Sequence, residues 1–330
     1  MARFYNGAMD VLTETCFLCY NFQVCGGLGK YCGTMGEGKA KSMEQETSMP
    51  MKSVKLHTYR IPIADVGLKH FFHFSDVHLS LYDAHSTEEQ RTNALKRENE
   101  WLKVRDYFAD KHEGGLPDER RISAKAHFEN LLKASGHCSC LVTTGDLLDY
   151  ISEANMKYLV RQLSDYPNPY MAVRGNHENP SLQGDHEAIE NPLKCGMEKP
   201  VQVIDFEDLL LLGIDNSDLK ISIGQLQALE KHASTGKPVL IAMHAPIVTE
   251  MNRSALEQAR SYDYFILNHE GCPSENTDFV KMILDKKYNV RGVLTGHLHF
   301  QCVTPLSESV WMYGVSQGIA GHLNEYWIGG

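Results

Sequence analysis

The stretch His-Phe-Phe-His-Phe-Ser-Asp-Val-His, residues 70–78, joins a predicted strand to two chemically active side chains. Residues 70–75 form a short apolar and aromatic run, which is typical of a buried strand. Asp76 and His78 follow where the chain is expected to leave the sheet, and His73 within the strand is interpreted as a core histidine or as the partner of a ligand. Because Asp-x-His also occurs by chance, this motif needs support from the rest of the chain.

The rest of the chain alternates between predicted strands and helices. Runs like the first one predict strands at residues 138–144, 170–173, 239–243 and 290–295. Helices are expected at residues 88–110, 123–134, 153–163, 223–232 and 277–286. This alternation predicts the α/β class.

The later strand ends also carry potential metal ligands. They read Gly145-Asp146-Leu147-Leu148-Asp149, Gly175-Asn176-His177-Glu178, His244 and Gly296-His297-Leu298-His299. Ligands of open α/β sheets bind just beyond the carboxyl ends of the strands, so we expect these segments to converge. They supply imidazole, carboxylate and amide groups without a thiolate, which suits Mn, Fe, Zn or Co.

Each segment alone also has a structural interpretation. Gly-Asp is typical of a turn, and Asp149 or Asn176 could begin a helix. A lone His244 would more often be packed in a core than bound to a metal. The functional interpretation therefore depends on all of the motifs occurring together, and residues 175–178 are the most specific of them.

Taken in order, the motifs resemble those of the calcineurin-like metallophosphoesterase superfamily over roughly residues 68–320. The resemblance implies a sandwich of two mixed β-sheets flanked by helices, with two divalent metal ions at one edge. It assigns one ion to Asp76, His78, Asp146 and His299, and the other to Asp146, Asn176, His244 and His297. Asp146 would bridge the ions, His177 would give a proton to the leaving group, and Asp149 would orient His177.

The resemblance implies hydrolysis of a small phosphate monoester or diester. Two divalent ions at roughly 3.5–4 Å can activate a shared hydroxide for attack on phosphorus. Asp149 stands where purple acid phosphatases have a metal-binding tyrosine, and Tyr150 stands where protein serine/threonine phosphatases have an arginine. Lipid A pathway hydrolases usually have an arginine at the position of His177. These differences favour the broad phosphodiesterase and cyclic-nucleotide phosphodiesterase-like group.

The sequence does not identify the residues that bind the substrate. Substrate choice is expected to reside in residues 80–137, 179–200 and 247–275. Arg174 is either a phosphate contact or half of a structural ion pair, and weaker pocket candidates are Tyr82, His85, Asn252 and His322. Two other classes of function stay open, namely a protein-binding scaffold with the same fold and a DNA-processing nuclease.

The composition is that of an ordinary globular protein, with 42% hydrophobic and 22% charged residues among 330. A formal net charge of −10 does not favour a partner such as bulk nucleic acid. No run of about 18 apolar residues occurs, and the first residues make a poor secretory signal, so we expect a cytoplasmic protein without a membrane partner. The nine cysteines are expected to be mostly reduced thiols. The oligomeric state is unknown.

Residues 1–51 differ in character from the rest. We expect a disordered extension or a misassigned start, with Met49 or Met51 as the true first residue. A zinc knot could also form there, but the second cysteine pair lacks the usual close spacing; its residues would be Cys16, Cys19, Cys25 and Cys32. The metallophosphoesterase domain is therefore expected to span residues 52–330.

Overall fold

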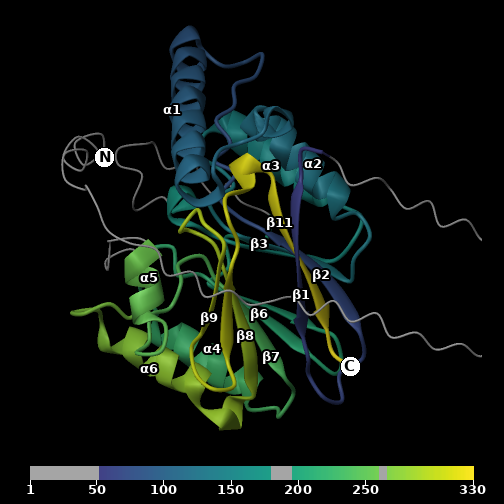
Figure 1. The fold of residues 1–330 in the computed structure, drawn as a ribbon, viewed down its shortest axis with the longest axis vertical. Coiled ribbons are helices and arrows are strands. Elements are labelled where there is room, and N and C mark those ends of the chain that lie inside the picture. The colour runs from purple at the N-terminus through teal and green to yellow at the C-terminus, as the bar shows by residue number, and fades with distance from the viewer. Residues whose placement is uncertain (1–51, 180–194, 260–265) are drawn as a thin grey trace, which may run out of the picture. The chain divides into compact units, whose positions relative to one another are not determined.

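Two β-sheets pack face to face in this computed structural model, and helices cover their outer faces (Figure 1). The structure describes residues 52–179, 195–259 and 266–330. In spatial order, the first sheet contains β1 (Lys55–Ile61), β11 (His322–Ile328), β2 (Lys69–Phe74), β3 (Cys140–Thr144) and β4 (Tyr170–Val173). The second contains β5 (Val201–Asp205), β6 (Leu210–Ile214), β7 (Val239–Ala242), β8 (Val290–Thr295), β10 (Trp311–Gly314) and β9 (Cys302–Pro305). The α-helices of these ranges are α1 (Glu88–Glu113), α2 (Ala124–Ala134), α3 (Glu153–Ser164), α4 (Ile223–Ala233), α5 (Arg253–Ala259) and α6 (Ser274–Leu284).

Both sheets combine parallel and antiparallel strands. β2, β3 and β4 are parallel neighbours, as are β6, β7, β8 and β10. The pairs β11–β2, β5–β6 and β9–β10 are antiparallel. Parallel neighbours place their carboxyl ends at the same edge of a sheet, and the predicted α/β sandwich of two mixed sheets is confirmed.

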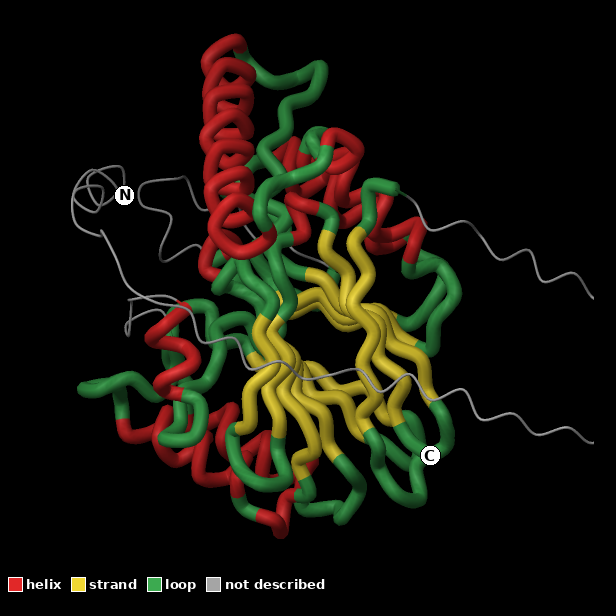
Figure 2. Tube along the Cα trace, in the orientation of Figure 1, coloured by secondary structure: helices red, strands yellow, loops and turns green. Residues whose placement is uncertain are grey.

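Alternation along the strands divides the core into layers. Phe71 of β2 faces the second sheet and belongs to the same buried cluster as Leu240 of β7. Phe74 points the other way, and its ring lies 5.9 Å from the ring of Phe128 in α2. Since successive side chains of a strand point to opposite faces, one strand can serve two cores. Figure 2 shows the result, with strands in the middle and helices outside.

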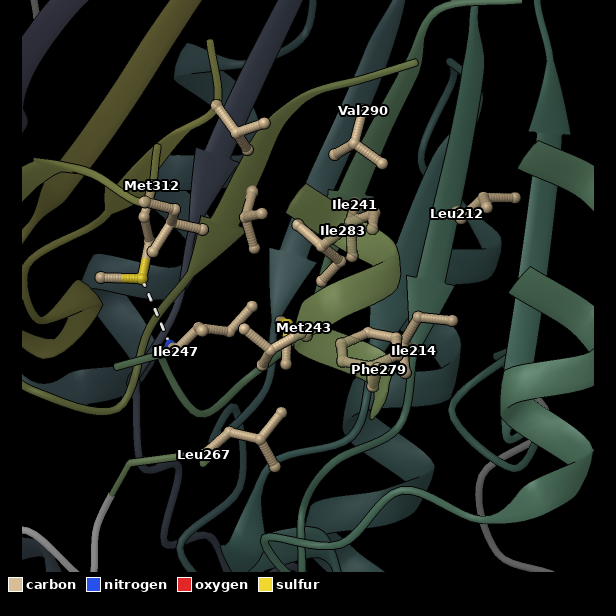
Figure 3. Close-up of a cluster of buried hydrophobic side chains, with 14 of the residues drawn as sticks. Leu212, Ile214, Ile241, Met243, Ile247, Leu267, Phe279, Ile283, Val290 and Met312 are labelled. Carbon is tan, nitrogen blue, oxygen red and sulfur yellow. Dashed lines mark hydrogen bonds between the residues drawn. The ribbon is translucent and has the colours of Figure 1, made fainter. Parts of the chain in front are cut away.

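The outer face of the second sheet forms a further core with α4 and α6 (Figure 3). Ile241 of β7 packs there with Phe279 and Ile283 of α6. Just beyond β7, the N–H group of Ile247 lies 3.4 Å from the sulfur of Met312 in β10. This packing fixes the ends of β7 and β8, from which two of the predicted ligand segments begin.

Several elements are absent from the prediction. β1 and β5 are sheet-edge strands whose side chains alternate between partly buried and exposed, so they lack an apolar run. β6 is also missing from the prediction, although all of its residues are buried. The prediction lacks β9, β10, β11 and α5 as well. The predicted helix at 277–286 is wrong by about one turn, because α6 begins directly after Pro273 and ends at Leu284.

All described residues belong to one compact unit, Met49–Gly330. The predictions for residues 1–51, including the cysteine group, lie outside the described residues. Across the described ranges, no helix combines the length and the apolar character needed to cross a bilayer.

A partly buried charge network fixes the carboxyl end of α1 to the first sheet. Glu113 Oε2 accepts hydrogen bonds from Lys55 Nζ (2.7 Å) and Arg120 Nη1 (3.0 Å), and Oε1 lies 2.6 Å from His322 Nε2. Burial alone would raise the pKa of Glu113, but these three contacts outweigh burial and hold the pKa well below its usual range. Burial lowers the pKa of His322 to about 4, so at neutral pH the balancing charges are those of Lys55 and Arg120.

We expect Glu113→Gln to lower the free energy of unfolding at pH 7 by roughly 1.5–3 kcal/mol, because Lys55 and Arg120 lose a partly buried charged partner. The difference from the unaltered protein should shrink as the pH falls below about 4.3, where the unfolded chain protonates Glu113 and the folded chain does not. Urea unfolding between pH 7 and pH 3 measures both effects, with the exposed Glu119→Gln as control. A difference that does not change with pH would rule out this account of the network.

Candidate metal centre

The strand ends that carry the predicted ligands meet at one edge of the two sheets. β2, β3 and β4 contribute from the first sheet, and β7 and β8 from the second. Three groups of potential ligand atoms lie there, each with its atoms within 4.8 Å of one another: Asp76, His78 and His299; His78, Asp146 and His177; and Asp146, His244 and His297. Since His78 and Asp146 each belong to two groups, the three groups form one continuous centre.

The first group directs three atoms toward a common point. Nε2 of His78 lies 3.2 Å from Nε2 of His299, and Oδ1 of Asp76 lies 3.9 Å and 3.2 Å from these two nitrogens. Oδ1 of Asp76 is buried and has no hydrogen-bond partner among the described residues. A buried carboxylate oxygen without a donor is costly, so this arrangement fits a cation.

The third group, together with Asn176, is centred on His244. Its Nε2 lies 3.0 Å from Asn176 Oδ1, 3.0 Å from His297 Nδ1 and 3.3 Å from Asp146 Oδ2. The other ring nitrogen, Nδ1, lies 2.6 Å from the carbonyl oxygen of Thr144, to which it can donate. Histidines that bind metals usually have such a partner, which fixes the tautomer and leaves the second nitrogen for the ion.

Hydrogen bonds between the two sheets hold the strand ends in place. The N–H group of His297, after β8, donates to Oδ2 of Asp76, after β2, at 2.8 Å. The His244 contact with Thr144 joins the ends of β7 and β3 in the same way. Residues that face the centre therefore also set the spacing of the two sheets.

Five of the candidate ligands have backbone angles that residues other than glycine rarely adopt. Their φ values are 57° for Asp76, 53° for His78, 50° for Asp146, 72° for His297 and 62° for His299. Each such residue costs on the order of 1–3 kcal/mol and persists only where its surroundings impose it, which happens most often at functional sites. The concentration of left-handed residues supports a functional interpretation of this edge.

Two glycines and one carboxylate shape the loops after β3 and β4. A Cβ atom on Gly145 would collide with the backbone of Gly175, and one on Gly175 would collide with the carboxylate of Asp146. The buried carboxylate of Glu178 accepts hydrogen bonds from the N–H groups of Gly175 (2.8 Å), Asp146 (2.9 Å) and Leu148 (2.7 Å). It ties the two loops together, a role that the motif alone did not reveal.

Asn216 is a second supporting residue absent from the prediction. Its buried Oδ1 accepts hydrogen bonds from the N–H groups of His244 (2.9 Å) and Ala245 (3.0 Å). Its Nδ2 donates to the carbonyl oxygen of Ala245 at 2.8 Å. These bonds fix the turn that presents His244, and the available signal was a polar residue shortly after the buried strand β6.

His177 and Asp149 lie together beside the centre. The His177 N–H group donates to Asp146 Oδ1 at 2.9 Å, and Nδ1 lies 2.6 Å from the carbonyl oxygen of Asp149 and 3.3 Å from its Oδ1. Burial would lower the pKa of His177, but the carboxylates of Asp146 and Asp149 outweigh it and raise the pKa to about 10. The shorter contact is with the main-chain carbonyl of Asp149 rather than with its carboxylate.

Carboxylates and imidazoles balance each other before any cation binds. Burial alone would raise the pKa of Asp146, but His244, His177 and His78 hold it well below its usual range. Burial would lower the pKa of His244, but the carboxylates of Asp146 and Asp76 raise it to about 9. At neutral pH, a cation that binds through His244 must therefore displace a proton.

The weaker predictions lie away from the ligands. Arg174 forms an ion pair with Asp215 (Nη1 to Oδ2, 3.3 Å), which agrees with its structural interpretation. Among the described residues, none of the four pocket candidates forms a hydrogen bond or ion pair with a candidate ligand; these are Tyr82, His85, Asn252 and His322. His73 is buried, with Nε2 2.7 Å from Thr144 Oγ1, which confirms a core role.

A model of the calcineurin-like phosphoesterase family matches residues 69–301, and the chain belongs to this family. Its two-sheet fold and its cluster of aspartate and histidine side chains agree with that membership, which supports metal-dependent phosphoester hydrolysis in general terms.

A comparison with solved structures finds matches from several organisms. A dimetal phosphatase from Danio rerio is 13% identical, with 76% of this chain and 88% of that chain covered and a TM-score of 0.43. The phosphopantetheinyl hydrolase from Mycobacterium tuberculosis is 14% identical, with 76% and 90% covered and a TM-score of 0.42. Purple acid phosphatase PPD1 from yellow lupin is 13% identical, with 77% and 44% covered and a TM-score of 0.42. A comparison with curated proteins finds no match.

Binding of Mn²⁺ at pH 7 should release protons, because His244 has a pKa of about 9 before a cation binds. The affinity should therefore fall as the pH is lowered. Calorimetric titration in two buffers of different ionisation enthalpy measures the number of protons released. The control is the variant with the exposed His137→Gln substitution, which should release the same number of protons as the unaltered protein. Binding without proton release would show that His244 takes no part.

Proposed function

We propose that this chain hydrolyses small phosphate esters, monoesters or diesters, with the help of two divalent cations held between the sheets. The observation that carries the proposal is the position of Asp146. Its carboxylate belongs to two groups of potential ligand atoms, one with His78 and His177 and the other with His244 and His297. A carboxylate in this position suits a bridge between two ions.

The proposed ligand sets are those that the resemblance of the motifs to the family implies. One ion would be held by Asp76, His78, Asp146 and His299, and the other by Asp146, Asn176, His244 and His297. When bound, two such ions acidify water, stabilise charge on phosphoryl oxygens and orient the ester for in-line attack. The two carboxylates do not cancel the charge of two divalent ions, so the site would attract phosphate despite the net charge of −10.

His177 is the residue best placed to donate a proton to the leaving oxygen. Its Nδ1 contact with the Asp149 carbonyl fixes the plane of the ring and makes Nε2 the atom that can carry a transferable proton. Cations at Asp146 would offset part of the negative charge that raises the pKa of His177. They would therefore bring the pKa of His177 closer to neutral pH. A general acid of this kind contributes roughly 10²–10⁴-fold in rate.

The scaffold alternative predicts that ligands or the proton donor have been lost. All seven candidate ligands and His177 are present in the sequence, so catalysis is the better-supported function. The nuclease alternative lacks a comparable observation, because the net charge of −10 does not favour a long polyanion.

The direct experiment is a panel of nitrophenyl monoester, bis-nitrophenyl diester and cyclic nucleotides, with Mn, Fe, Zn, Ni or Mg. We expect hydrolysis of at least one ester, loss of activity after chelation and recovery with added cation. The relative rates separate phosphatase from phosphodiesterase. Full activity in a metal-depleted sample would be incompatible with the proposal.

His177→Asn should slow alkyl esters by roughly 10²–10⁴-fold and nitrophenyl esters much less, because only the poor leaving group needs the proton. Its metal content, measured by mass spectrometry, should equal that of the unaltered protein. The exposed His137→Gln serves as the matched control. Equal slowing of both ester classes would remove the proton-donor role from His177.

A further inference from the structure

One face of α1 lies against the candidate metal centre. Arg97, Trp101, Arg105 and Phe108 occur at intervals of four, four and three residues, which places them on the same side of a helix. The indole of Trp101 stacks on the imidazole of His78, with ring centroids 3.5 Å apart and planes 8° from parallel. Phe108 reaches His299 at a centroid distance of 5.2 Å. A helix from outside the ligand segments thus covers part of the site.

The same face of α1 surrounds the carboxylate of Asp149 with donors. Arg97 Nη2 (2.8 Å) and Trp101 Nε1 (2.6 Å) donate to Oδ1, and Arg97 Nε (2.5 Å) donates to Oδ2. Ser80 Oγ adds a fourth hydrogen bond to Oδ2 at 3.0 Å. Burial would raise the pKa of Asp149, but His177 and Arg97 hold it well below its usual range, so the carboxylate is ionised. The shortest contacts of this carboxylate are with α1.

The main chain of Asp149 also contacts the imidazole ring of His177. Its carbonyl oxygen accepts the 2.6 Å contact from His177 Nδ1, and its N–H group donates to the carbonyl oxygen of Leu79 at 3.0 Å. The main chain of Asp149 thus joins the loop after β2 to His177, while its side chain is held by α1. A shift of Asp149 would move the partner that sets the plane of the His177 ring.

An anchor that served only to attach α1 would not need an arginine. Taking a guanidinium and a carboxylate out of water is costly and is not in itself a source of stability. The paired geometry instead fixes the orientation of the Asp149 carboxylate, because the planar guanidinium of Arg97 donates to both carboxylate oxygens. Trp101 adds a hydrogen-bond donor on one edge while its face covers His78.

We propose that Arg97 and Trp101 are positioning residues, which hold Asp149 and thereby fix His177 for proton transfer. The inference rests on the proposed function for its effect on rate. Its structural part, that α1 determines the placement of the His177 ring, stands without any measurement of activity.

The variants are Arg97→Met, which removes the fork of donors, and Trp101→Phe, which keeps an aromatic ring on His78 and removes the N–H donor. Controls are the neighbouring Lys96→Met, whose side chain is 72% exposed, and Trp311→Phe, which is 41% exposed. Circular dichroism and urea unfolding establish that each variant is folded. Metal content is measured for every sample.

The kinetic arm compares alkyl and nitrophenyl esters. Both test variants should lose kcat for alkyl esters by up to about 10²-fold, as expected for a misplaced catalytic group, with KM changed less than about twofold. Nitrophenyl esters should be slowed much less, and the controls should match the unaltered protein. Equal slowing of both ester classes in active enzyme would reduce Arg97 and Trp101 to a structural role.

The second arm uses the protein without added metal and needs no substrate. The ring C–H signals of His177, assigned by their loss in His177→Asn, should shift in Arg97→Met and stay in place in both controls. Trp101→Phe is not used in this arm, because the Trp101 ring lies 5.3 Å from the His177 ring and its replacement would itself shift these signals. Unchanged His177 signals in folded Arg97→Met would overturn the inference. Absence of hydrolysis in the unaltered protein would instead sink the proposed function, and the His177 signals would still decide whether α1 positions this ring.

Discussion

Two sheets can share one metal centre only if the ends of their strands are held together, and a few hydrogen bonds between the sheets impose this constraint. The bond from the His297 main chain to Asp76 joins β8 to β2, and the contact of His244 with the Thr144 carbonyl joins β7 to β3. Because these bonds use the candidate ligands themselves, the metal centre and the packing of the sandwich are specified by the same residues. The left-handed backbone at Asp76 and His297 is a local cost of this arrangement.

The charges of the buried side chains determine what the site can bind. Buried aspartates beside buried imidazoles form a set that is balanced by protons or by cations. Oδ1 of Asp76 accepts no hydrogen bond, which favours cations. A supporting layer keeps these groups in place. Glu178 joins the loops after β3 and β4, Asn216 holds the turn at His244, and the donors of α1 surround Asp149. Rigid placement of this kind allows a site to act on charge that develops during a reaction.

The candidate ligands could be located from the sequence because each one lies within a few residues of a strand end. Asp76, Asp146 and His297 follow short apolar runs, and the order of such motifs along the chain is itself informative. The supporting residues were not predictable in this way, because their partners are distant in sequence. Glu178 bonds to Leu148 across 30 residues, and Arg97 bonds to Asp149 across 52. β1 and β11 escaped prediction for the same reason, since polar residues interrupt both strands and they pair across most of the chain.

The account is tested most directly by anomalous X-ray scattering from crystals of the protein grown with Mn²⁺. It predicts two anomalous peaks, one beside Asp76, His78 and His299 and one beside Asn176, His244 and His297, with the carboxylate of Asp146 between them. A single peak that does not contact Asp146, or no peak at this edge of the sheets at saturating Mn²⁺, would contradict the central claim.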